Sequence, residues 1–293
     1  MKTLKQIVLA AALCAGAGAI AAQAPQVQDG IQVKPLPRYR VLASEEKLEQ
    51  QASLQYSGLM AQAREKRALA PDNNPQLIRL RAIAGRIIPF TARWNPDAAK
   101  WNWQVNLLGS KQVNAFCMPG GRIAFFSGIL TSLNLTDDEI AAIMGHEITH
   151  ALREHGREQA VKGTVTQLAS RLGGAALSAW LGIDPRLTDS LAQQGGQLAV
   201  LKFSRDDERE ADLVGLDLAA RAGYDPRAGV ALWQKMGALN ARQPIAFLST
   251  HPSGADRIAQ INAHMDVLLP LYARAKGAGV AQLPAYRTSA MPN

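Results

Sequence analysis

His146, Glu147 and His150 form the pattern His-Glu-x-x-His, in which two imidazoles and a carboxylate can act on one metal ion. On a helix, side chains four residues apart lie one turn apart on the same face, so both imidazoles can reach the ion. Glu147 lies about 100° around the helix from His146, close enough to hold a water beside the metal and to act as general base. The pattern is typical of zinc peptidases, and it predicts one Zn2+ per chain.

A catalytic zinc site needs a third protein ligand and keeps its fourth position open. His155 is one candidate, nine residues after His146. On the helical wheel the side chain of His155 lies about 180° from that of His146. We therefore expect His155 to pack or to form a hydrogen bond rather than to bind the metal.

The acidic segment from Ser204 to Asp212 supplies a better candidate for the third ligand. Four residues in and after it lie within about 60° of one another on a helical wheel and predict a water-facing stripe: Asp206, Glu210, Asp217 and Arg221. Glu208 lies on the opposite side with Gly215, where small residues allow another helix to come close. A carboxylate on a buried face needs a partner, and a metal is a good one. We predict that Glu208 is the third ligand, that Glu210 lies on the surface, and that Asp212 hydrogen-bonds a ligand histidine and fixes its tautomer.

A mainly helical chain must position these residues. Thr136 to Glu139 has the sequence of a capping box, which opens the helix that carries His146 and continues to about His155. Apolar periodicity and capping signals predict further helices over about 44–69, 75–88, 206–222, 226–240 and 255–275. Three segments have strand patterns instead: 101–107, 112–118 and 122–127. The predicted fold class is α+β, a mainly helical zincin-type metalloprotease domain with a small mixed or antiparallel sheet and the zinc-binding helix at its core.

Residues 1–24 have the features of a secretory signal peptide. Lysines precede an apolar run, and small residues follow it, with cleavage favoured after Ala21 or Ala22. The run is shorter than the roughly 20 residues needed to span a bilayer. Leu13, before Cys14, is larger than a lipid-attachment site takes, so lipoprotein anchoring is not expected. We predict export to the bacterial periplasm, a single metalloprotease domain over 25–275 with an extended lead-in over 25–43, and a flexible tail over 276–293.

The composition excludes several other classes of protein. Hydrophobic residues make up 47% of the chain, which rules out wholesale disorder. Aromatic residues make up only 5%, and the net charge of +8 comes without a basic cluster, so no nucleic-acid partner is expected. The two cysteines are too few for a disulfide scaffold, and we expect Cys117 to be a small buried hydrophobe. The apolar segment 165–183 is interrupted by polar residues, which favours a buried or membrane-leaning helix over a membrane span.

Further motifs make the chain resemble metallopeptidase family 48, the gluzincins that include HtpX, the CAAX prenyl proteases, BepA and LoiP. The matching pieces lie in order over about residues 75–270: Asn114-Ala115-Phe116 with Pro119-Gly120-Gly121, His146 to His150, Glu208 to Asp212, Ala222-Gly223-Tyr224-Asp225-Pro226, and Thr250-His251-Pro252. In that family the ligating acid is the first glutamate of Glu-x-x-Ala-Asp, which agrees with Glu208. The resemblance is to a compact exported member, without the membrane spans of HtpX or the tetratricopeptide extension of BepA.

The resemblance also implies roles for residues outside the zinc motif. It points to His251 and Arg257 as catalytic groups that stabilise the oxyanion forming at the scissile carbonyl. Alternatively, His251 occupies the fourth zinc position and keeps the enzyme latent, as the matching histidine can in BepA-like members. Gluzincins align a peptide as an added strand along a sheet edge, and the resemblance places that edge at Asn114, Ala115 and Phe116. The alternative is that these three residues belong to an ordinary inner strand.

The expected function is hydrolysis of peptide bonds in unfolded or misassembled envelope proteins, as protein quality control in the periplasm. Recognition of an extended backbone implies weak sequence demands and partners that are unfolded or misfolded proteins. One alternative is a non-catalytic, zinc-stabilised chaperone or assembly factor for outer-membrane proteins, although such a protein needs no general base at Glu147. A second is a factor in peripheral association with the outer membrane or its assembly machinery, through segment 165–183 and the basic surface.

Overall fold

The computed structural model describes residues 29–36, 43–159, 203–252 and 255–292. The predicted signal peptide and the apolar segment 165–183 lie outside the described residues. The helices with both ends among the described residues are α1 (Glu45–Glu65), α2 (Pro75–Ile87), α3 (Ser127–Leu133), α4 (Asp137–Leu152), α7 (Arg205–Arg221), α8 (Ala228–Asn240), α9 (Ala246–Thr250), α10 (Ala255–Ala263) and α11 (Met265–Ala275). Short 3-10 helices are η2 (Ile88–Arg93), η3 (Pro96–Lys100) and η5 (Val280–Gln282). None of these helices is both long enough and apolar enough to cross a membrane.

A three-stranded mixed sheet forms the other part of the fold. Its strands are β1 (Gln104–Leu108), β2 (Ala115–Met118) and β3 (Arg122–Phe126), in the order β1-β3-β2. β1 runs parallel to β3, whereas β2 runs antiparallel to it. Gly120 and Gly121 both have positive φ angles in the tight turn between β2 and β3. The predicted α+β class, mainly helical with a small mixed sheet, is confirmed.

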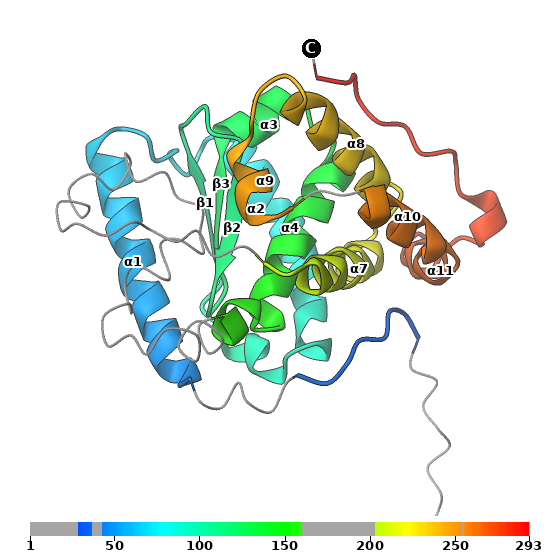
Figure 1. Ribbon diagram of the computed structural model, residues 1–293, viewed down its shortest axis with the longest axis horizontal. Helices are drawn as coiled ribbons and strands as arrows, with labels where there is room; N and C mark the ends of the chain where they lie inside the picture. Colours follow the sequence, from blue (N-terminus) through cyan, green and yellow to red (C-terminus); the bar gives the residue numbers. More distant parts are fainter. Residues whose placement is uncertain (1–28, 37–42, 160–202, 253–254, 293) are drawn as a thin grey trace, which may run out of the picture.

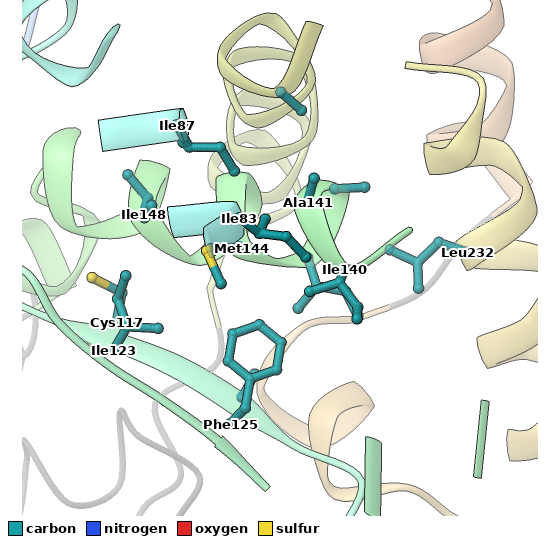
Figure 2. Packing of buried hydrophobic residues seen from close by; sticks show 14 of the residues in the cluster. Ile83, Ile87, Cys117, Ile123, Phe125, Ile140, Ala141, Met144, Ile148 and Leu232 are labelled. Carbon is teal, nitrogen blue, oxygen red and sulfur yellow. The ribbon is translucent and has the colours of Figure 1, made fainter. Parts of the chain in front are cut away.

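Helices cover both faces of this sheet (Figure 1). The strand residues alternate, so Phe116 and Phe126 pack in a cluster with Tyr56 of α1 on one face. Ile123 and Phe125 point to the opposite face, where they pack against α2 and α4 (Figure 2). The helix α4, which carries the His-Glu-x-x-His pattern, therefore lies between the sheet and the helices α7 and α8, which hold it from both sides.

The start of α4 agrees with the prediction, but its end does not. Glu139 N donates to Oγ1 of Thr136 at 3.2 Å and Thr136 N donates to Oε2 of Glu139 at 2.8 Å, which completes the capping box. The helix ends at Leu152 rather than near His155. Glu154 has a left-handed φ of 55°, which turns the chain out of the helix before His155. The wheel position predicted for His155 is therefore wrong.

Other differences from the predicted elements arise where proline or short segments are involved. Pro89 ends α2 as expected, but the chain continues directly into η2, because proline is tolerated in the first turn of a helical segment. The helix predicted over 255–275 is two helices, α10 and α11, that meet at His264. The short helices α3 and α9 were not predicted. Such brief elements carry too few residues for a clear apolar period.

Asp217 does not lie in a water-facing stripe of α7. Its side chain is fully buried, because the lead-in segment runs over this part of the helix. Oδ2 of Asp217 accepts a hydrogen bond from Ile31 N at 2.9 Å, and Oδ1 accepts one from Nε of Arg221 at 2.6 Å. The lead-in, expected as extended chain, thus covers a face that a helical wheel assigns to solvent.

The C-terminal segment is anchored rather than free. Lys235 and Glu139 form a buried ion pair at 2.8 Å, and neither side chain is exposed to solvent. Thr288 and Tyr286 both donate hydrogen bonds to Oε1 of Glu139. A buried carboxylate needs its remaining lone pairs satisfied, and the hydroxyls of this segment satisfy them. The prediction of a flexible tail over 276–293 therefore does not describe the observed segment up to residue 292.

The helices α4 and α7 approach so closely that their backbones touch. A Cβ atom added to Gly215 lies 2.5 Å from the backbone N of His146, and one added to Gly145 lies 2.3 Å from the carbonyl O of Gly215. Both distances are shorter than any ordinary contact of a carbon atom. Only glycine fits at these two positions, and the contact brings the His-Glu-x-x-His pattern beside the N-terminal half of α7.

We expect Gly215→Ala to lower the free energy of unfolding by about 1–3 kcal/mol, because the added methyl group forces the helices apart. The same movement carries Glu208 away from the histidines and weakens metal binding. Thermal unfolding in chelator and a zinc titration measure the two effects. Gly237→Ala in α8 is the matched control, because no atom lies within 4 Å of its added Cβ. If both variants behave alike, the glycine contact does not set the distance between the helices.

Candidate metal centre

Four buried side chains from three parts of the chain meet in the helical core. His146 and His150 come from α4, Glu208 comes from the first turns of α7, and His251 directly follows α9. One donor atom from each lies within 4.8 Å of all the others, and no side chain is more than 4% exposed. Within the described residues, this is the group of histidine, cysteine and acidic side chains that can hold a metal ion.

The distances between the donor atoms fit an ion of the size of zinc. Nε2 of His146 lies 3.1 Å from Nε2 of His150 and 3.2 Å from Nδ1 of His251. Oε1 of Glu208 lies 3.0 Å from Nδ1 of His251 and 3.5 Å from Nε2 of His150. Tetrahedral zinc with bonds of about 2.0–2.1 Å requires neighbouring ligand atoms about 3.3 Å apart. These four distances are close to that value, and a nitrogen of His251 is the fourth donor of the group.

The local structure of α7 explains why Glu208 faces inward. Ser204 and Asp207 form a capping box at the start of the helix, which fixes its first turn. Glu208 then points toward α4, on the side of Gly215, as the wheel predicted. Glu210 is not a free surface residue, because it forms an ion pair with Arg153 and its side chain is 23% exposed.

The second ring nitrogen of His146 contacts Asp212. Nδ1 of His146 lies 3.1 Å from Oδ1 of Asp212, which also accepts a hydrogen bond from Nε1 of Trp233 at 3.2 Å. A carboxylate only accepts hydrogen bonds, so His146 carries its hydrogen on Nδ1. Its Nε2 lone pair is then free to point at the ion.

The guanidinium of Arg257 contacts the carboxylates of Glu208 and Asp212 rather than pointing to a position where a substrate could bind. Its guanidinium donates from Nη1 to Oε2 of Glu208 at 2.5 Å, and from Nε and Nη2 to the two oxygens of Asp212 at 2.6 Å each. The side chain is 3% exposed and lies over the ring of Trp233 at 3.6 Å. These contacts differ from the expected oxyanion role, because the donors already point at carboxylates of the site.

Glu147 has a free oxygen in the core. The side chain is 3% exposed, and its Oε1 has no hydrogen-bond partner among the described residues. Nε2 of His251 is 3.6 Å away, which is too long for a hydrogen bond. Burial raises the pKa of Glu147 above its ordinary value. An unpaired buried carboxylate oxygen beside the donor cluster is a position where a water or substrate atom belongs.

The buried charges of the site call for a cation. Burial alone raises the pKa of Glu208 and Asp212, but nearby positive groups, Arg257 among them, outweigh it and lower the pKa of both acids. Burial lowers the pKa of His150, so this ring is neutral, as a metal ligand must be. Burial also lowers the pKa of His251, but Glu147 and Glu208 outweigh it and raise that pKa. When ionised, the three acids carry more negative charge than the single guanidinium offsets, and either a protonated His251 or a bound cation reduces the excess.

The remaining histidines lie outside the four-donor group. His155 is buried and hydrogen-bonds His150, as expected of a histidine that is not a ligand, and burial lowers its pKa to about 4. His264 contacts the carbonyl O of Gln260 at 2.8 Å and takes no part in the site.

The proposed substrate strand β2 lies at the edge of the sheet formed by the described residues. The side chain of Ala115 points to the α4 side, whereas Phe116 points away from it and packs edge-on against Tyr56. Asn114 is buried, and its Oδ1 accepts a hydrogen bond from Ala115 N. The side chain of Phe116 therefore lies on the face of the sheet away from the four-donor cluster.

Aromatic rings around the histidines were not predicted. Phe247 stacks on His251 with ring centres 4.4 Å apart, and Phe203 lies 3.9 Å from the ring of His150. Phe247 precedes His251 by one helical turn, and this spacing is the sequence signal that was available. The rings exclude water and hold the imidazoles in place.

We expect Arg257→Met to lower the free energy of unfolding by about 3–5 kcal/mol at neutral pH, measured by denaturant unfolding in chelator. Removing one partner of a buried ion pair leaves uncompensated charges, here on Glu208 and Asp212. Arg257→Lys should restore part of the loss. Arg209→Met is the control, since Arg209 forms only exposed ion pairs with Asp206 and Asp256. A loss no larger for Arg257→Met than for the control contradicts this arrangement.

Comparison with known proteins agrees with the site. A sequence profile described as peptidase family M48 matches residues 79–265. The chain is 35% identical over 171 residues to the mitochondrial metalloendopeptidase OMA1 of Arabidopsis thaliana, a match that covers 57% of this chain and 33% of OMA1. It is 29% identical over 201 residues to the metalloprotease LoiP of Escherichia coli, covering 68% of this chain and 75% of LoiP.

The beta-barrel assembly-enhancing protease of Escherichia coli is 26% identical over 183 residues, covering 60% of this chain and 37% of that protein. The chain thus spans about a third of the length of the plant OMA1, and most of LoiP. The profile covers more than half of the chain, including the whole of α4 and α7. On this evidence the chain belongs to peptidase family M48.

Proposed function

We propose that this chain is a zinc-dependent metalloendopeptidase that hydrolyses peptide bonds in unfolded or misassembled proteins of the bacterial periplasm, as part of protein quality control. The observation that carries the proposal is the buried cluster of His146, His150 and Glu208 beside the unpaired oxygen of Glu147. Two neutral imidazoles and a carboxylate are a typical ligand set of a catalytic zinc ion.

Each residue of the site has a separate role in the proposed hydrolysis of the peptide bond. Bound zinc supplies a Lewis acid, which polarises the scissile carbonyl and makes a water molecule acidic enough to attack it. Glu147 accepts the proton of that water on its free Oε1 and passes it to the departing amine. Its raised pKa brings the carboxyl closer to the neutral pH at which a general base works best. Asp212 and Arg257 keep His146 and Glu208 in position.

His251 holds the fourth corner of the cluster in the proposed resting state. Its Nδ1 lies within 3.2 Å of donor atoms of both His146 and Glu208, which favours a latch over an oxyanion donor. Its Nε2 faces Glu147 at 3.6 Å. Movement of this ring opens the fourth position to water and substrate, as a catalytic zinc site requires.

The edge strand β2 supports the choice of unfolded proteins as substrates. In this proposal an extended peptide pairs with the backbone of β2, at the edge of the sheet formed by the described residues, and it can do so only if the peptide itself has no structure there. Pairing through backbone groups places few demands on the sequence of the substrate. Asn114, Ala115 and Phe116 therefore bind substrate through their main chain in this proposal.

The proposed location depends on residues 1–24, which have the pattern of a signal peptide. Two of the relatives are bacterial, and one of them is named for the assembly of beta-barrels. The second name supports a role with outer-membrane proteins and a peripheral association with their assembly machinery. Loss of the chain from isolated membranes on washing with high salt is the expected result for an electrostatic association.

One observation favours the alternative of a non-catalytic chaperone. With His251 included, the cluster has four protein donors, which is the composition of a structural zinc site. The free oxygen of Glu147 argues against this function, since a purely structural site needs no buried base.

We expect Glu147→Gln to keep its zinc and to lose casein cleavage by at least about 100-fold, because the amide cannot accept the proton. Glu208→Ala should lose both zinc and activity. Metal analysis and a casein assay, each with and without chelator, measure the outcomes. Glu65→Gln, at the exposed end of α1, is the control and should match the parent. Unchanged cleavage by Glu147→Gln would falsify the mechanism.

His251→Ala distinguishes the latch from the oxyanion donor. We expect the variant to raise basal casein cleavage, because it frees the fourth position, while His146, His150 and Glu208 keep the zinc bound. An oxyanion donor predicts instead a loss of about 100-fold or more. Activity equal to that of the parent removes His251 from both roles.

A further inference from the structure

His155 contacts a ligand of the metal centre, although it donates no atom to the four-donor cluster. The chain leaves α4 at Arg153 and turns through the left-handed Glu154, which directs His155 back toward His150. The two Nδ1 atoms lie 3.0 Å apart, and the ring centres lie 4.9 Å apart. His155 is 3% exposed, so no water competes with this contact.

The geometry decides which ring donates the hydrogen. Nε2 of His150 is the atom that faces the cluster, 3.1 Å from His146 and 3.5 Å from Glu208. That nitrogen must be free of hydrogen to bind a metal, so the hydrogen of the neutral ring is on Nδ1. The hydrogen bond then exists only if Nδ1 of His155 accepts it and His155 carries its own hydrogen on Nε2.

The opposite arrangement is incompatible with metal binding. If His155 donated from Nδ1, His150 would accept on Nδ1 and carry its hydrogen on Nε2, toward the other ligands. We propose that His155 is a positioning residue, whose Nδ1 accepts the hydrogen bond from Nδ1 of His150 and so fixes the tautomer and orientation in which His150 binds zinc. The inference rests on the proposed zinc function, and it assigns His155 a role that Asp212 has toward His146.

The choice of a neutral acceptor has an electrostatic reason. The site already holds the carboxylates of Glu147, Glu208 and Asp212 against the single guanidinium of Arg257. A carboxylate at the position of His155 would add a fourth buried negative charge to the site, whereas a neutral imidazole accepts the same hydrogen bond without a charge. His155 therefore orients the ligand at no electrostatic cost to the site.

Two variants of similar shape test the proposal. Asparagine at position 155 can place Oδ1 where Nδ1 of His155 lies, whereas leucine offers no acceptor. We expect His155→Leu to weaken zinc affinity by about 10–100-fold, and His155→Asn to stay within a few-fold of the parent. Competition with a chelator measures the affinity. Thermal unfolding of the metal-free proteins reports structural damage, which should be similar in the two variants.

The proposal is overturned if His155→Leu binds zinc as tightly as the parent. It is also overturned if His155→Leu and His155→Asn lose the same amount of zinc affinity and this loss follows the stability of the metal-free proteins. Glu208→Ala, measured in parallel, separates this failure from failure of the zinc site. If Glu208→Ala also binds zinc like the parent, the proposed metal centre is wrong. If only Glu208→Ala loses zinc, the centre stands and the role of His155 does not.

A spectroscopic measurement on the parent protein covers the case in which a variant does not fold. The chain has five histidines, so their ring nitrogens can be resolved after labelling with nitrogen-15. In the zinc-loaded protein we expect hydrogen on Nδ1 of His150 and on Nε2 of His155. Hydrogen on Nδ1 of His155 contradicts the proposal without any substitution.

Discussion

The contact between Gly145 and Gly215 is the constraint on which the metal centre depends. Donor atoms of α4 and α7 lie 3.5 to 3.6 Å apart, close enough to share one ion, and side chains reach such distances only if the helices that carry them nearly touch. A methyl group at either glycine meets backbone atoms of the other helix. The fold therefore brings these donor atoms together by packing the two helix backbones against each other.

Close packing of α4 and α7 brings several buried carboxylates together, and a neighbouring cationic side chain compensates part of their charge. Arg257 binds Glu208 and Asp212 at the same time. One guanidinium therefore holds both Glu208, a member of the four-donor cluster, and Asp212, the hydrogen-bond partner of His146. It comes from α10, which ties a third helix to the contact between α4 and α7. A divalent cation bound at the cluster would offset negative charge that Arg257 leaves uncompensated.

The sequence predicted the parts of the site that lie on regular helices. His146, His150 and Glu208 follow from helical spacing, because periodicity fixes which residues share a face. The predictions fail where the position of a side chain depends on irregular segments or on contacts between residues far apart in the chain. The lead-in covers Asp217, the left-handed Glu154 redirects His155, and Arg257 meets two acids more than forty residues away in the chain. No local pattern encodes such contacts, because they depend on how complete elements pack.

The segment that carries His251 links the fourth corner of the cluster to the proposed substrate edge. Backbone N of Phe247, in α9, donates to the carbonyl O of Val113, which lies just before β2 (Figure 1). Thr250 accepts a backbone hydrogen bond from Phe203, beside His150. A peptide that pairs with β2 approaches the same segment that positions His251. Under the proposed latch, a peptide paired with β2 would therefore lie beside the segment that holds His251 at the fourth corner of the cluster.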